Sequence, residues 1–235
     1  MRKREFTAAL CLLPLGAAVW AQTQPGIAAL AGVSRQDAAA ALRQALEQAA
    51  RDAVRQLGRP DGFWADARYR IGLPPGLRDA EPLLRRLGQG GRVDELLQAM
   101  NRAAEQAVPE AQTLLLAAVR ALSLEDARRI LTGGETAGTA YFSEKTRPGL
   151  QRRFEPIVQA ATERVQLGRA HDELMAPLAS HGLVPQEQAR LHVHVTRKAL
   201  DALFEVMADF ERRLRRDPLA AGSALLQRVY GALRP

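Results

Sequence analysis

Apolar residues recur every three or four positions along most of the chain, and this spacing is typical of amphipathic helices. One such series follows Ser34 and consists of Leu42, Leu46, Ala50, Val54 and Leu57. No segment alternates apolar and polar residues for long enough to form a strand of a sheet. The connections between the periodic segments are short, which indicates helices packed as antiparallel neighbours. The sequence therefore predicts an all-α fold, a compact multi-helix bundle.

Capping residues, prolines and glycines predict where the helices begin and end. Ser34, with Asp37 three positions later, is a capping signature at the start of the first helix. After that helix, a run of prolines and glycines predicts one irregular, extended segment near residues 60–78. Pro109 and Pro148 are expected to break the helices in which they occur, because proline lacks a backbone donor.

The N-terminal residues have the three parts of an export signal. Residues 2–4 are all basic, and residues 7–21 carry no charge. Small side chains precede a cut between Ala21 and Gln22, as signal peptidase requires. The apolar stretch contains Pro14 and is shorter than the roughly 20 residues that span a bilayer, so a membrane anchor is not expected. The pattern predicts a cleaved signal peptide, and it leaves open whether the general secretory or the twin-arginine route is used.

Cleavage would divide the chain into a signal peptide at residues 1–21, a flexible arm at 22–33 and a single helical domain at 34–235. The cut removes Cys11, the only cysteine, so the mature chain has no thiol for a disulfide, a metal or a nucleophile. It also removes three cations and one acid, which lowers the formal net charge from +7 to +5. We therefore expect an exported domain that is stabilised by packing alone, with no transmembrane segment after the cut.

The basic composition does not indicate nucleic-acid binding. The basic side chains are scattered among acids, and no aromatic residues alternate with them to stack bases. Paired arginines occur at 85–86, 128–129, 152–153 and 212–213, and we interpret them as solvated helix surface. His192 and His194 lie two positions apart on an expected helix, so they point in different directions. The sequence predicts no nucleic-acid partner, no metal site and no cofactor.

Polar residues gather in two central segments. Asn101 and Glu105 lie one turn apart at the edge of an apolar face, with Glu110 just beyond Pro109. A glycine turn at residues 133–134 is followed by Thr136, Thr139 and Tyr141. Such groups could line a pocket, with carboxylates as acid or base, or they could cap helices and join them by hydrogen bonds. The structural interpretation is favoured, and no catalytic residue is assigned.

These segments resemble the signatures of a known family, and the resemblance extends in order over nearly all of the chain after the signal peptide. The matching segments are residues 57–63, 73–74, 87–90, 100–111, 130–142 and 196–204. They are similar to the domain of unknown function 4197 family. The resemblance implies a largely helical bacterial protein, exported to the periplasm, and it implies no particular activity. The candidate set of binding or structural residues is Arg59, Asp61, Asn101, Glu105, Glu110, Thr136, Thr139 and Tyr141.

Three hypotheses about function remain. The favoured one is a non-enzymatic binding or envelope-associated protein that takes a hydrophobic ligand or an envelope protein as its partner. The alternative is a hydrolase-like enzyme that uses Glu105, Glu110, Glu135 or Tyr141, which requires two of these groups to converge in a cleft. A third is a scaffold that forms homo-oligomers through the helix after Pro185.

Overall fold

The computed structural model describes residues 30, 32–123, 125, 127–180 and 191–233. The predicted signal peptide, its cleavage site between Ala21 and Gln22, and most of the arm lie outside this part. All regular structure within it is helical, which confirms the all-α prediction. The helices are α2 (Arg35–Leu57), α3 (Pro75–Arg86), α4 (Gly90–Arg120), α5 (Ala127–Leu131), α6 (Ala137–Arg164), α7 (Leu167–Ser180), α8 (Leu191–Arg216), the 3₁₀ turn η1 (Pro218–Ala220) and α9 (Ala224–Gly231).

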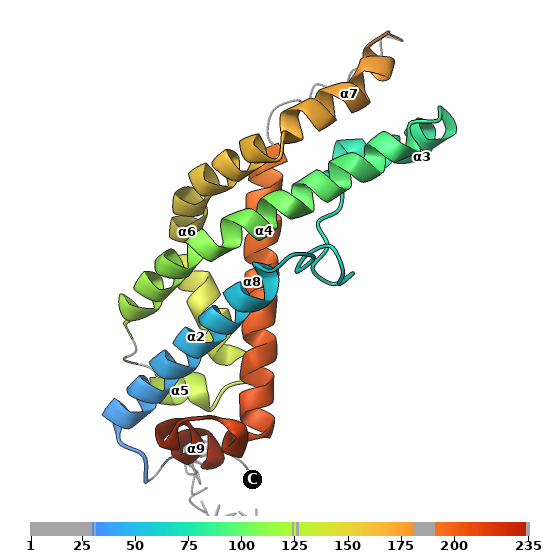
Figure 1. The fold of residues 1–235 in the computed structure, drawn as a ribbon. Helices are drawn as coiled ribbons and strands as arrows, with labels where there is room; N and C mark the ends of the chain where they lie inside the picture. Colours follow the sequence, from blue (N-terminus) through green and yellow to red (C-terminus); the bar gives the residue numbers. More distant parts are fainter. Residues whose placement is uncertain (1–29, 31, 124, 126, 181–190, 234–235) are drawn as a thin grey trace, which may run out of the picture.

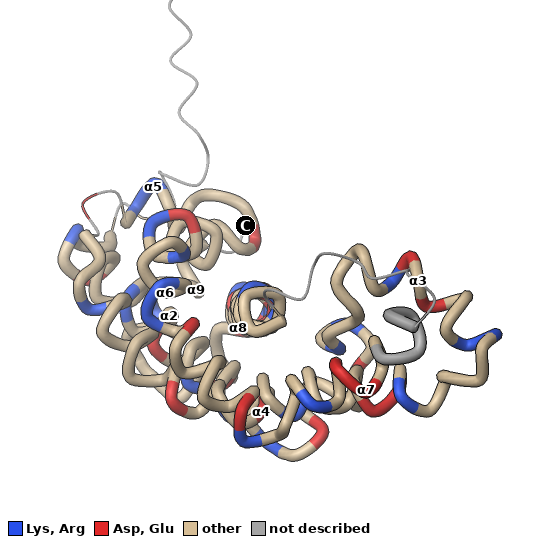
Figure 2. Tube along the Cα trace, turned by 90° about the horizontal axis from the view of Figure 1, so that it is seen from above, with Lys and Arg blue, Asp and Glu red and all other residues tan. Residues whose placement is uncertain are grey.

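The helix α8 runs along the middle of the bundle (Figure 1). It packs against α2, α4 and α6, and α4 packs in turn against α2 and α6. Figure 2 looks along α8 and shows α2 and α6 on one side, α3 and α7 on the other and α4 passing beneath. Apolar side chains fill the spaces between these helices, among them Leu42, Met100, Phe142 and Leu203, which are all buried. Phe142 and Phe204 meet edge to face, with their ring centroids 5.8 Å apart.

The helices are amphipathic, with polar residues on their outer faces. Lys and Arg are interspersed with Asp and Glu along the helices, so the positive net charge is dispersed (Figure 2). Within the described part of the chain, no helix is both long enough and apolar enough to cross a bilayer. The helices are therefore stabilised by burying one face each against their neighbours.

The first helix begins and ends where the sequence predicts. Asp37 donates its backbone N–H to the Ser34 hydroxyl at 2.9 Å, which is the expected N-cap. At the other end, a Cβ on Gly58 would lie 2.8 Å from the Val54 carbonyl and 3.0 Å from Cγ of Pro109. Only glycine therefore fits where α2 ends against α4. The irregular segment that follows occupies residues 58–74 and ends sooner than expected, because Pro75 begins α3.

Two predicted helix breaks are wrong. Both α4 and α6 continue through their prolines, Pro109 and Pro148. A proline inside a helix loses one backbone hydrogen bond and costs about 3 kcal/mol. Here each helix has buried apolar side chains both before and after its proline: Val108 and Ala111 in α4, and Phe142 and Leu150 in α6. Burying one such side chain contributes about 1.5–3 kcal/mol, so a few of them outweigh the lost hydrogen bond.

Candidate functional site

The side chain of Asn101 holds the irregular segment to α4 much as a neighbouring strand would. Its Oδ1 accepts the backbone N–H of Ile71 at 2.8 Å, and its Nδ2 donates to the Ile71 carbonyl at 2.9 Å. A second bond runs from Nδ2 to the Leu97 carbonyl at 2.8 Å. Asn101 is fully buried, and these partners satisfy its amide. It therefore positions the segment rather than facing a ligand.

Glu105 binds the same segment one turn further along α4. Its buried carboxylate accepts the backbone N–H groups of Phe63 and Trp64 at 3.2 and 3.4 Å. Arg102 donates to Glu105 at 2.6 Å and to Asp61 at 2.7 Å, and its hydrogen bond to Glu105 is the main cause that raises the pKa of Arg102. Asp61, Asn101 and Glu105 from the candidate set are thus brought together around the segment at residues 58–74.

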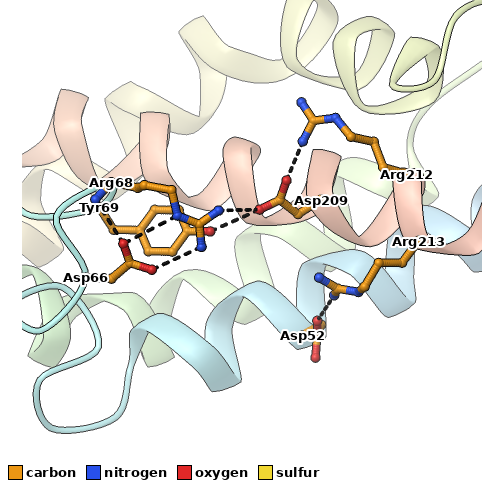
Figure 3. A network of polar contacts seen from close by, with 7 residues as sticks. All are labelled: Asp52, Asp66, Arg68, Tyr69, Asp209, Arg212 and Arg213. Carbon is orange, nitrogen blue, oxygen red and sulfur yellow. Dashed lines mark hydrogen bonds and ion pairs between the residues drawn. The ribbon is translucent and has the colours of Figure 1, made fainter.

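The other side of this segment is fixed to α8 (Figure 3). Arg68 pairs with Asp66 at 3.0 Å and with Asp209 at 3.2 Å. The Tyr69 hydroxyl donates to the same Asp209 carboxylate at 3.2 Å, and burial of the ring raises the pKa of Tyr69. Arg212 completes the network through Asp209. The segment is therefore held between α4 and α8, and its polar residues serve that attachment.

The two neighbouring histidines have separate partners. His194 is buried, and its Nε2 lies 2.9 Å from the Gly72 carbonyl, so the ring donates from Nε2. Burial lowers the pKa of His194, an effect that the bond to Gly72 opposes. His192 lies 3.4 Å from Glu155 instead. Within the described residues, no group of three or more metal-ligating side chains comes together.

A second buried cluster lies where α6 meets α8. The Glu211 carboxylate accepts the backbone N–H groups of Gly138 and Thr139 at 3.0 and 2.8 Å and the Thr139 hydroxyl at 2.8 Å. These N–H groups belong to the first turn of α6, where no intrahelical acceptor is available. Arg215 neutralises the carboxylate at 2.9 Å. Glu211 therefore acts as an N-cap supplied by another helix.

The sequence contained a signal for Glu211 that we did not use. Glu211 lies four residues after Met207 and three before Leu214, both of which are buried. It therefore occupies the apolar stripe of α8. A charged residue on such a stripe is buried and needs a partner on a neighbouring helix.

The remaining candidate residues lie apart from these clusters. Arg59 is exposed, and Thr136 precedes α6 without a side-chain cap bond. Glu110 pairs with Arg164 at 3.2 Å, and Tyr141 donates its hydroxyl to the Ser123 carbonyl at 3.0 Å. Glu135 lies 3.9 Å from Arg216. Each of the hydrolase candidates Glu105, Glu110, Glu135 and Tyr141 thus has its own partners among the described residues, and no two of them share one.

Tyr141 does line the largest of the grooves considered, which we call the α4–α6 groove. It has a volume of about 710 Å³, within the roughly 300–1,000 Å³ of pockets that bind small molecules. Its floor is apolar and its rim is basic. The lining residues are Leu114, Ala118, Ala121, Leu122, Ser123, Tyr141, Lys145, Thr146, Gly149, Leu150, Arg152 and Arg153.

The charge of the α4–α6 groove sets it apart from two other grooves of the described structure. Its described lining includes three cations and no carboxylate. A groove of about 510 Å³ between α4 and α7 has two acids, Glu95 and Glu173, and two arginines. A third, of about 490 Å³ beside α2, α8 and η1, has Asp52, Asp217 and two arginines. Only the first of these three has an excess of positive charge.

Comparison with known proteins gives one match. A family model described as a protein of unknown function, DUF4197, matches residues 32–231. No curated protein and no solved structure is significantly similar to the chain. The matched region includes α2 to α9 and both buried clusters, and it begins after the predicted signal peptide.

Proposed function

Because the chain belongs to the DUF4197 family, whose description states no activity, we propose a function from its own residues. The protein is an exported, non-catalytic binding protein of the periplasm, and its ligand lies in the α4–α6 groove. The single observation that carries this proposal is a groove with an apolar floor and unbalanced positive charge. Sites for small molecules are typically concave and mostly apolar, with a few polar or charged groups that fix the orientation of the ligand.

Export is supported by the pattern at the N-terminus. Three basic residues, an uncharged stretch and small side chains before Gln22 are the three parts of a cleavable signal. The family match begins at residue 32, beyond this segment. N-terminal sequencing of the protein recovered from the periplasm of an expressing cell tests the idea: Gln22 should be the first residue. Protein that stays in the cytoplasm and keeps Met1 would disprove export.

Gly149 provides the test of the groove. It lies on the groove wall, and a Cβ at this position meets nothing within 4 Å. Gly149→Phe should therefore fill the groove while the helix around it stays intact. Gly149→Ala is the matched control, because its methyl group occupies little of the space. Circular dichroism and thermal unfolding establish that both variants are folded.

The measurement compares small molecules that remain bound through purification. Organic extracts of the unsubstituted protein and of Gly149→Ala should contain a compound that extracts of Gly149→Phe lack. If all three proteins carry the same compounds, or if none carries any after gentle purification from the periplasm, the groove is not the binding site.

A further inference from the structure

The cations of the α4–α6 groove surround the gap that Gly149 leaves. Lys145 and Arg152 lie four residues before and three residues after Gly149, so the three share one face of α6. Lys145 lies 3.1 Å from Glu144, but both side chains are exposed, and such pairs are weak. Arg152 and Arg153 are exposed and form no ion pair with any residue that the structure describes. The groove therefore offers two to three cations to an anionic group.

The floor of the groove is apolar. Leu114 and Ala118 lie one turn apart on one face of α4, and Leu122 follows two residues after the helix ends at Arg120. Leu150 of α6 is buried beside them. An apolar chain that lies along this floor would remove these side chains from water, which contributes about 25 cal/mol for each Å² of apolar surface.

Contacts near both ends of the groove hold α6 against α4 and the residues that follow α4. Tyr141 binds the Ser123 carbonyl at one end, and Glu110 pairs with Arg164 beyond the other. Packed helices have their axes about 8–10 Å apart, whereas a helix with its side chains is about 10–12 Å wide. A helix of a partner protein could not enter between them, but one alkyl chain is thin enough.

Resting on the proposed function, we propose that the ligand of the α4–α6 groove is a single-chain anionic lipid of the fatty-acid type. Its carboxylate lies beside Arg152, Arg153 and Lys145, and the two arginines have no ion-pair partner among the described residues. Its alkyl chain lies along Leu114 and Ala118 of α4 and Leu122 just after that helix. The ligand thus matches both the charge of the rim and the apolar floor.

Calorimetric titration of the purified protein tests this ligand class. Dodecanoate, used below its micelle concentration, should bind the unsubstituted protein more tightly than dodecanol does. The double variant Arg152→Gln/Arg153→Gln should bind dodecanoate about tenfold more weakly, since two exposed charge contacts together contribute on the order of 1.4 kcal/mol. The double variant Arg59→Gln/Arg86→Gln loses the same charge from exposed positions outside the groove, and it should bind dodecanoate as the unsubstituted protein does.

Three results would overturn the ligand class. Equal affinity for dodecanoate and dodecanol would show that the cations do not contribute to binding. If Gly149→Phe then bound neither compound, the groove would still be a binding site, and only the ligand class would fail. If the two double variants bound dodecanoate equally weakly, the loss of affinity would follow from the net charge and not from the position of Arg152 and Arg153. Binding to vesicles that contain anionic phospholipid, without binding of dodecanoate, would place the ligand in a bilayer. If the extracts also show no groove-dependent compound, the proposed function fails together with the ligand class.

Discussion

At the scale of single residues, Asn101 shows how one side chain can replace a strand. The segment at residues 58–74 forms no ladder with a neighbouring strand, yet the N–H and C=O of Ile71 are buried and need partners. The Asn101 amide supplies one acceptor and one donor. Few other side chains offer both groups in this arrangement, which explains the choice of asparagine on an otherwise apolar helix face.

Replacement of Asn101 by alanine should destabilise the protein by about 2–6 kcal/mol, because two buried backbone groups lose their partners at about 1–3 kcal/mol each. Urea unfolding followed by circular dichroism measures the change. Arg59→Ala, at an exposed position of the same segment, is the control and should stay within about 0.5 kcal/mol. Equal effects of the two substitutions would mean that the bonds of Asn101 contribute nothing to stability.

His194 should give the protein a pH-dependent stability. Burial lowers the pKa of His194 below its ordinary value of 6.5, so around that pH the unfolded chain binds a proton more readily than the folded chain. Stability is therefore present above the unfolded pKa and is lost as the pH falls toward the lowered folded pKa. The neighbouring cations Arg197, Lys198 and Arg78 act in the same direction.

The measurement is a pair of urea unfolding curves at about pH 7 and pH 5.5, where histidine titrates and carboxyl groups mostly do not. The unsubstituted protein should lose stability between the two conditions. His194→Gln, whose amide can still donate to the Gly72 carbonyl, should lose less. Identical losses in both proteins would assign the pH dependence to other groups.

At the scale of elements, α6 contains two glycines with opposite surroundings. A Cβ on Gly138 would lie 2.8 Å from Cδ1 of Leu42 and 3.1 Å from Oε1 of Glu211, whereas a Cβ on Gly149 would meet nothing within 4 Å. Gly138→Ala should therefore cost about 1–3 kcal/mol through overpacking. Gly149→Ala should stabilise the helix by up to about 1 kcal/mol. Thermal unfolding should show a lower midpoint temperature for Gly138→Ala and a higher one for Gly149→Ala. Shifts of the same sign would contradict the packing described at Gly138.

The element scale also shows what local sequence can and cannot predict. The Ser34 cap and the irregular segment follow from short-range chemistry, and the structure contains both. The continuity of α4 and α6 through Pro109 and Pro148 does not follow, because it depends on apolar contacts with helices far away in the sequence. Propensity is a weak guide where tertiary packing is extensive.

At the scale of the whole molecule, the candidate residues divide between the attachment of the irregular segment and the wall of the α4–α6 groove. Asp61, Asn101 and Glu105 hold the segment at residues 58–74, while Tyr141 lines the α4–α6 groove. The sequence placed them in one set because they are polar residues within two motifs. Their separate roles depend on how α4, α6 and α8 pack, which no motif records.

The groove itself was not predictable from the sequence. Its two walls come from residues 114–123 and 141–153, and neither segment alone has a pattern that indicates a binding site. The arginine pair at 152–153 is like the other pairs in the chain until packing places it beside an apolar floor. Only the antiparallel pairing of α4 with α6 creates that combination of charge and apolar surface.

The central claim is that the α4–α6 groove binds the ligand, and hydrogen exchange measured by mass spectrometry tests it most directly. Addition of dodecanoate should slow amide exchange in residues 114–123 and 141–153. Exchange in the segment at residues 58–74 should stay unchanged, and Gly149→Phe should show no slowing in either groove wall. Slowing confined to other helices, or the same slowing in Gly149→Phe, would contradict the account.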